Sequence, residues 1–191
     1  MIAEMGIVVI NMLNIFFVSR YLGATGVAAY ELIFPVMAVI VAIGCLFYTG
    51  TQTICAKDYG AADPESFAKH RNAAYSWVIT AMGTVMILLY VLQAPVLDLL
   101  GANDGDSQLY QLSSQCYSWF LPSMIPGGVY VTACSLLYFE EKRSLLIANL
   151  ILFVSMILGS IAVVLTSPSM TGFIVINTMA YFLADIYIFF I

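Results

Sequence analysis

The stretch that decides the fold is VAAYELIFPVMAVIVAIGCLFYTGTQTICA, residues 27–56, in which Glu31 is the one charged side chain. A run of about 20 apolar residues wound as an α-helix matches the hydrocarbon thickness of a bilayer, roughly 30 Å. The apolar residues do not alternate with polar ones, as they would in a strand of a membrane β-barrel. The stretch therefore predicts a membrane-spanning helix. It is long enough to need tilt or a bend, for which Pro35 is the candidate.

The rest of the chain has the same character. Of the 191 residues, 62% are hydrophobic and 9% are charged, and the mean hydropathy is +0.98. An ordinary soluble domain is about 45–50% apolar and about 25% charged. We therefore expect an all-α integral membrane protein, with residues 1–191 forming a single six-helix transmembrane bundle. The six spans are expected at residues 2–22, 27–56, 75–100, 116–139, 145–166 and 173–191.

Two short polar segments mark the joints between these spans. Residues 23–26, GATG, predict a turn between the first two spans. Residues 63–66, DPES, predict the start of the helix that leads into the third span. There Asp63 can cap free backbone N–H groups, and Pro64 suits the first helical position.

The basic residues predict the orientation. The joints after the second and fourth spans contain Lys57, Lys69, Arg71, Lys142 and Arg143, whereas those after the third and fifth contain no Lys or Arg. Cytoplasmic loops of membrane proteins carry an excess of Lys and Arg. We therefore expect a multi-pass protein of the cell membrane, in the bacterial inner membrane, with these joints and both termini on the cytoplasmic side.

Several functional classes are disfavoured by the sequence. The net charge of −5 argues against a nucleic-acid partner, which requires a basic surface. No metal-ligand spacing, Gly-rich phosphate loop or catalytic pair of acids lies within one span, so we expect no metal, no cofactor and no enzyme activity. The cysteines lie in apolar stretches, and we interpret them as packing residues. They are Cys45, Cys55, Cys116 and Cys134.

Residues 14–35, NIFFVSRYLGATGVAAYELIFP, resemble the first helix, the turn and the start of the second helix of MATE-family (multidrug and toxic compound extrusion) exporters. The shared marks are a Leu-Gly turn, an Ala-Ala pair and a proline a few residues later. The resemblance continues through Gly50, residues 56–63 (AKDYGAAD) and residues 99–102 (LLGA). It implies one six-helix lobe, the N-terminal one, of a twelve-helix transporter. The second lobe would come from further sequence or from a partner chain, and the substrate cavity would lie between the lobes.

The chain departs from that family at the positions that usually couple transport to an ion. Family members often carry an Asp at the position of Asn14, and an Asn and an Asp one turn apart near the positions of Ser155 and Gly159. A carboxylate within the bilayer is the usual device for exchanging an ion against substrate. The resemblance implies H⁺ or Na⁺ as the coupling ion, yet Asn14 cannot take up a proton.

Four polar side chains within the predicted spans are candidates for a substrate or ion pathway: Asn14, Glu31, Gln52 and Asp185. Asn14 either lines a cavity or bonds to another helix, because an unpaired polar group in hydrocarbon costs several kcal/mol. Gln52, with its neighbouring threonines, either joins helices or lines a water-filled cavity.

Two of these candidates are acids. Glu31 lies near the outer end of its span, where we expect a solvated residue or a partner for Arg20; the alternative is a replacement proton carrier. Asp185 is flanked by apolar residues, and a carboxylate in such a span indicates function by default. If the chain ends near the cytoplasmic surface, Asp185 instead lies at a shallow depth.

The fourth span contains candidate bends at Pro122 and Pro126, followed by Gly127 and Gly128. Discontinuous helices of this kind often flank transporter sites. A simple packing bend is the commoner explanation.

The leading functional hypothesis is a lobe of a secondary antiporter that exports amphipathic organic compounds, including xenobiotics, by alternating access. One alternative is a flippase for a lipid-linked precursor. We expect such a flippase to have a basic cavity, because phosphate is bound by Arg and Lys, and the spans contain almost no cations. Another alternative is a truncated membrane remnant that does not transport, or an assembly partner.

Overall fold

The computed structural model describes residues 2–102, 107–140 and 142–190, and every regular element in these ranges is a helix. The elements are α1 (Ile2–Gly60), α2 (Pro64–Val91), α3 (Gln93–Leu99), α4 (Ser107–Phe120), the 3₁₀ helix η1 (Leu121–Ser123), α5 (Met124–Glu140), α6 (Lys142–Thr166) and α7 (Met170–Phe189).

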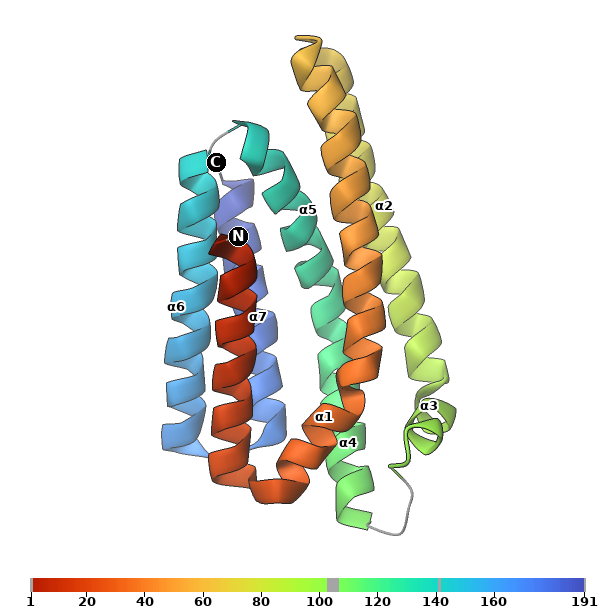
Figure 1. Ribbon diagram of the computed structural model, residues 1–191, viewed down its shortest axis with the longest axis vertical. Coiled ribbons are helices and arrows are strands. Elements are labelled where there is room, and N and C mark those ends of the chain that lie inside the picture. Colours follow the sequence, from red (N-terminus) through yellow and green to blue (C-terminus); the bar gives the residue numbers. More distant parts are fainter. Residues whose placement is uncertain (1, 103–106, 141, 191) are drawn as a thin grey trace.

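Helix α1 contains two arms joined by a sharp kink (Figure 1). The backbone leaves the helical conformation at Gly23, with φ 68° and ψ −165°. This region of backbone space is open essentially to glycine alone. The N-terminal arm, residues 2–22, is about 30 Å long at 1.5 Å per residue, which is enough to cross a bilayer. The predicted four-residue turn is therefore wrong in detail, because one glycine makes the reversal and residues 24–26 are already helical.

Five helical segments are long and apolar enough to cross a membrane. They are Ile15–Gly60, Pro64–Val91, Ser107–Leu137, Arg143–Thr166 and Met170–Phe189. The first of them includes the C-terminal arm of α1 and residues 15–22 of its N-terminal arm, and the fold confirms the predicted all-α transmembrane bundle. Large apolar side chains such as Leu46 and Leu165 are exposed, and in a membrane protein this outer surface faces lipid.

The predicted start of the third-span helix is confirmed. Asp63 is the N-cap of α2, where its side chain accepts a hydrogen bond from the Ser66 backbone N–H at 3.1 Å, and Pro64 lies in the first turn. The helix then breaks after Val91 and resumes as the short α3. The apolar stretch predicted to end at residue 100 is thus divided between two helices.

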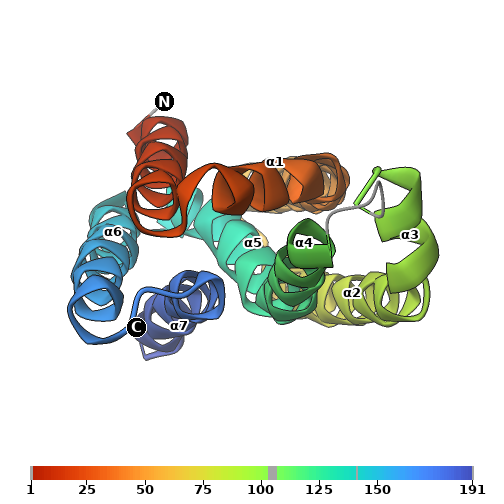
Figure 2. The same ribbon diagram turned by 90° about the horizontal axis from the view of Figure 1, so that it is seen from below.

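The helices form two groups with α4 and α5 between them (Figures 1 and 2). The N-terminal arm of α1 lies with α6 and α7, and the ring of Phe17 stacks on Phe173 of α7 with centroids 6.0 Å apart. The C-terminal arm of α1 pairs with α2 in a hairpin that rises above the other helices. The main core includes the buried side chains of Ile33, Met82 and Tyr117.

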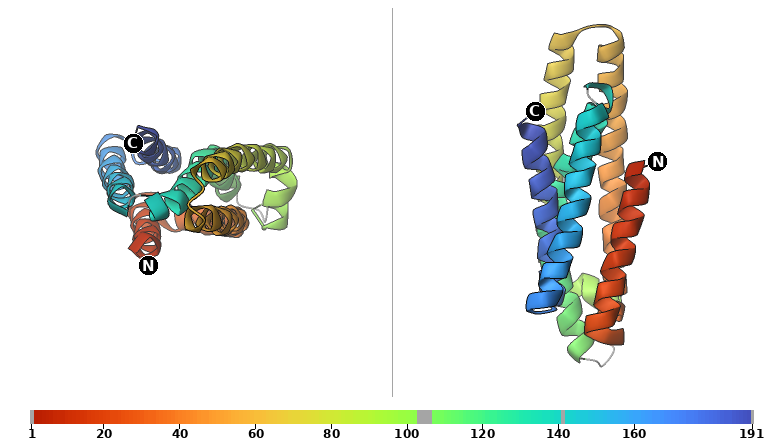
Figure 3. Two further views of the ribbon diagram at one scale, coloured as in Figure 1. Left: turned by 90° about the horizontal axis from the view of Figure 1, so that it is seen from above. Right: turned by 90° about the vertical axis from the view of Figure 1, so that its left-hand side faces the viewer.

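Both termini lie in the same half of the molecule as the α1–α2 and α5–α6 joints (Figure 3). Near these joints, in the adjoining turns of α1, α2 and α6, lie the predicted cytoplasmic basic residues Lys57, Lys69, Arg71 and Arg143. At the same end, the His70 Nδ1 atom lies 2.6 Å from a carboxylate oxygen of Asp58 and links α2 to α1. The Gly23 kink and the α6–α7 joint lie at the opposite end (Figure 1).

Candidate functional site

The most unusual polar group in the described spans is the carboxyl group of Asp185, on α7. Ser169 caps this helix by accepting a hydrogen bond from the Gly172 N–H at 3.1 Å. Asp185 lies in the next-to-last turn and is only 6% exposed. Its Oδ1 atom has no hydrogen-bond partner within the part of the chain that the structure describes. Buried polar atoms are nearly always hydrogen-bonded, so this exception needs an explanation.

A second buried oxygen without a partner lies on the facing helix, α5. The hydroxyl group of Tyr130 makes no hydrogen bond to an oxygen or nitrogen of any described residue, and Tyr130 is 6% exposed. The Tyr130 ring packs on Tyr181 with centroids 5.7 Å apart and the planes at 60°. Tyr181 lies one helical turn before Asp185, so both residues project from the same face of α7.

Cys134 completes this group. It follows Tyr130 by one turn on α5, and its thiol interacts electrostatically with both Tyr130 and Asp185. We name Tyr130, Cys134, Tyr181 and Asp185 the α5–α7 polar cluster.

The surroundings of the cluster are apolar. Side chains of α6 and α7 pack beside it, and the buried ones are Ala148, Leu152, Met156, Ala180 and Ala184. Gly127 lies one turn before Tyr130 on α5, where an added Cβ would be 4.0 Å from a ring carbon of Tyr181. Small residues of this kind allow membrane helices to approach closely. The sequence analysis selected Asp185 but missed Tyr130, and it assigned Cys134 to packing.

The other predicted candidates lie apart from this cluster. Glu31 is exposed on the C-terminal arm of α1 and Arg20 is exposed on the N-terminal arm. No ion pair joins these two described side chains, so the expected pairing is not formed, and the exposed Glu31 fits the other expectation, a solvated residue. Gln52 is half-buried on the C-terminal arm. Asn14 lies in the N-terminal arm, but its side chain is outside the described part of the structure.

Helix α6 contains no carboxylate near the two positions where the family often carries a polar pair. The Ser155 hydroxyl donates to the backbone carbonyl of Ile151 at 2.7 Å, within its own helix. Gly159 packs tightly on α7, since an added Cβ would lie 2.3 Å from Cγ2 of Ile176. Both residues therefore act in helix structure and packing here.

The prolines lie at different kinds of position. Pro35 lies inside the C-terminal arm of α1, which remains helical around it. Pro122 lies in η1, between α4 and α5, and Pro126 lies in the first turns of α5. Early helical positions tolerate proline because their N–H groups have no partner within the helix.

A hydrogen-bonded clamp, also missed by the sequence analysis, holds the α2–α3 break against α4. The Gln93 Nε2 atom donates to the hydroxyl oxygens of Ser114 at 2.9 Å and Ser118 at 3.0 Å. The Tyr117 hydroxyl donates to the backbone carbonyl of Leu89 at 3.0 Å.

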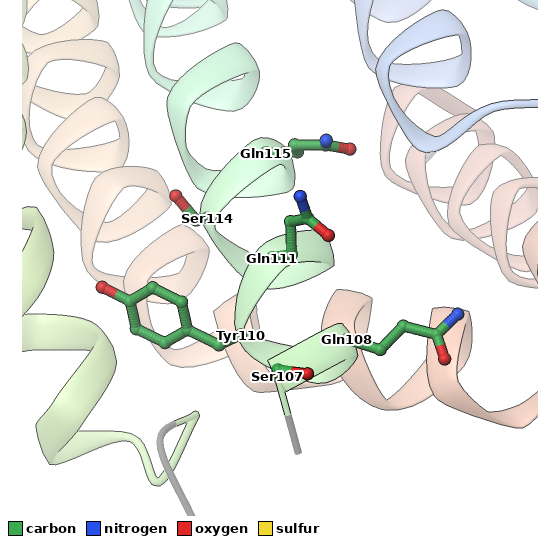
Figure 4. Close-up of a pocket in the computed structure, with 6 residues that line it drawn as sticks. All are labelled: Ser107, Gln108, Tyr110, Gln111, Ser114 and Gln115. Atoms are coloured by element: carbon green, nitrogen blue, oxygen red, sulfur yellow. The ribbon is translucent and has the colours of Figure 1, made fainter. Parts of the chain in front are cut away.

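An open hollow of about 500 Å³ lies at the start of α4 (Figure 4). Figure 4 shows Gln108, Gln111 and Gln115 projecting from one side of the helix, and Tyr110 and Ser114 from the other. These side chains offer hydrogen-bond donors and acceptors without charge. Nowhere in the described ranges do three or more His, Cys, Asp or Glu side chains form a group that could hold a metal ion.

Comparison with known proteins identifies a family and solved structures that this chain resembles. A family model described as MatE matches residues 1–165. No curated protein sequence matches the chain significantly. A multidrug resistance MATE family transporter of the MOP superfamily, solved in an outward-facing conformation, aligns with a TM-score of 0.88 at 18% sequence identity, over 98% of this chain and 41% of its own.

Two further solved structures give the same result. The Vibrio cholerae MATE transporter VcmN in its bent form has a TM-score of 0.86 at 18% identity, over 97% of this chain and 42% of its own. A MOP superfamily transporter from Pyrococcus furiosus has a TM-score of 0.86 at 17% identity, over 98% of this chain and 41% of its own. The reversed polarity of that transporter's binding pocket suggests a different function for it. The chain thus has the fold of one lobe and spans about two fifths of each transporter.

Proposed function

Because the chain belongs to the MatE family, we propose that it is the N-terminal lobe of a secondary antiporter that exports amphipathic organic compounds. The observation that carries this proposal is the agreement of nearly the whole chain with one lobe of MATE transporters. Such a lobe rocks against a second lobe around a central site and opens it alternately to each side of the membrane. We propose that further sequence or a partner chain supplies that second lobe.

The arrangement of charges supports an inner-membrane protein with both termini in the cytoplasm. Both termini lie in the same half of the lobe as the α1–α2 and α5–α6 joints with their basic residues. Basic joints stay on the cytoplasmic side. In this orientation the hollow at the start of α4 opens toward the outside.

The described polar surfaces favour organic compounds over lipid phosphates as the cargo. The hollow at the start of α4 is lined by uncharged Gln, Ser and Tyr side chains. A flippase for phosphorylated lipids would need Arg or Lys side chains to bind phosphate.

An efflux assay tests the proposal. The full-length protein, with its second lobe, is produced in cells that lack their own exporters, and loss of a preloaded fluorescent organic cation is followed. We expect faster loss than from vector-only cells, and we expect a protonophore to abolish the difference. Equal loss from both cell types, with the protein present in the membrane, would contradict the exporter and favour the non-transporting alternative.

A further inference from the structure

We propose that Asp185 and Tyr130 form a proton-binding site between α5 and α7. Its role in coupling rests on the proposed antiport function. The site would supply the titratable acid that Asn14 cannot provide and that is missing near Ser155 and Gly159 of α6.

The first argument is the pair of unsatisfied oxygens. Asp185 Oδ1 and the Tyr130 hydroxyl are both buried, and neither has an oxygen or nitrogen partner among the described residues; the weakly hydrogen-bonding Cys134 thiol lies beside the Tyr130 hydroxyl. The two residues interact electrostatically across the α5–α7 contact. Leaving a buried polar group unpaired costs about 1–3 kcal/mol, and more for a charged one. Two such groups on neighbouring helices, joined through the Tyr130–Tyr181 ring contact one turn from Asp185, therefore indicate a site that binds something small.

The second argument is the chemistry of the surroundings. Among the described side chains, the titratable groups near Asp185 are Tyr130 and Cys134 from α5 and Tyr181 from its own helix. Tyr187 packs at the edge of the same apolar shell, and α6 contributes the apolar side chains of Ala148, Leu152 and Met156. None of these groups is a cation that could pair with a carboxylate.

A proton fits this site better than a metal cation. Hard cations such as Ca²⁺ and Mg²⁺ bind several oxygen ligands. The α5–α7 polar cluster offers one carboxyl group and phenolic hydroxyls, with a soft thiol beside them. A proton on the carboxyl group removes its charge and gives it a donor, for which the Tyr130 oxygen is an acceptor.

The location of the site gives it a role in coupling. Asp185 lies four residues before the end of α7 at Phe189, which is about 6 Å along the helix axis. The site therefore lies in the second half of α7, where this helix packs against α5. With the proton bound, the apolar shell can close around a neutral group. After release, the carboxylate must be hydrated, which favours separation of α5 from α7.

Infrared spectroscopy of the full-length protein in lipid nanodiscs tests the site without requiring transport. Difference spectra between about pH 6 and about pH 9, a range in which ordinary carboxyl groups stay ionised, report the carbonyl stretch of a carboxyl group that still titrates there. We expect such a band in the parent, its complete loss in Asp185→Asn, and a shifted band in Tyr130→Phe, which keeps the ring but lacks the hydroxyl. Asp98→Asn removes an exposed carboxyl group at the other end of the molecule and should leave the band unchanged.

The outcomes separate the site from the function. A band that persists in Asp185→Asn would overturn the site, and an unshifted band in Tyr130→Phe would overturn the pairing with Tyr130. A band that disappears when Na⁺ replaces choline would show that Na⁺, rather than a proton, is the ligand. An Asp185-dependent band without efflux would refute the antiport proposal and leave the site standing. Proton-coupled efflux without that band would refute the site and leave the antiport proposal standing. Gel filtration of each variant shows that it is folded.

Discussion

At the scale of single residues, the reversal of α1 depends on Gly23. An added Cβ there would meet no atom within 4 Å, so the cost of Gly23→Ala is backbone strain at φ 68° rather than crowding. A non-glycine residue held in such a region costs about 1–3 kcal/mol. We expect Gly23→Ala to lower the free energy of unfolding in detergent by about this amount.

Gly83→Ala is the matched control for that substitution. Gly83 lies in α2, and a Cβ there also has open space. Alanine is favoured over glycine in a helix by up to about 1 kcal/mol. The control should therefore be neutral or stabilising. Equal thermal unfolding curves for the two variants would show that the Gly23 conformation stores no strain.

The α2 cap makes a pH-dependent contribution to stability. The hydrogen bond from the Ser66 backbone N–H holds the pKa of Asp63 below its usual range. Because the pKa is lower in the folded protein than in the unfolded chain, this stabilisation is complete above the ordinary aspartate pKa, about 3.9, and disappears as the pH falls through the folded value.

We therefore expect the melting temperature of the parent to fall more steeply on acidification below about pH 4 than that of Asp63→Asn. Asparagine caps the helix without titrating, and the other carboxyl groups titrate in both proteins. Parallel melting curves across this range would show that the cap contributes nothing to the acid sensitivity.

At the scale of elements, the sequence predicted what depends on local chemistry. The start of α2 was predictable because Asp63, Pro64 and Ser66 act on the same helix turn. The fourth span begins earlier than predicted, because the first turns of α4 carry Gln108, Gln111 and Gln115, which a hydropathy pattern assigns to a loop. The α2–α3 break is held by bonds between helices, and no local pattern reports them.

The α6–α7 contact gives a prediction at this scale. In Gly159→Ala, the new Cβ would lie 2.3 Å from Cγ2 and 2.9 Å from Cδ1 of Ile176, so one helix must shift. Overpacking of this kind typically costs about 1–3 kcal/mol. We expect a lower melting temperature for Gly159→Ala, partly restored in the double variant Gly159→Ala/Ile176→Ala, which removes the clashing atoms. Additive losses in the double variant would contradict the contact.

At the scale of the whole molecule, composition and charge predicted the membrane bundle and its connectivity. They did not predict which helix faces meet. Asp185 stands out in the sequence because a carboxylate within an apolar span is unusual, whereas Tyr130 resembles any aromatic residue of a span until α5 is placed against α7. A binding site made by two helices is visible only after the lobe is packed.

The orientation of the lobe can be tested from the two sides of the membrane. Glu65 is exposed in the first turn of α2, and Ser167 is exposed in the α6–α7 joint at the other end of the bundle. Because the basic joints should stay inside, a membrane-impermeant maleimide should label Ser167→Cys in intact cells. It should label Glu65→Cys only after the cells are made permeable. Labelling of the parent measures the background from the native cysteines. The opposite pattern would place the basic joints at the outer face and contradict the proposed orientation.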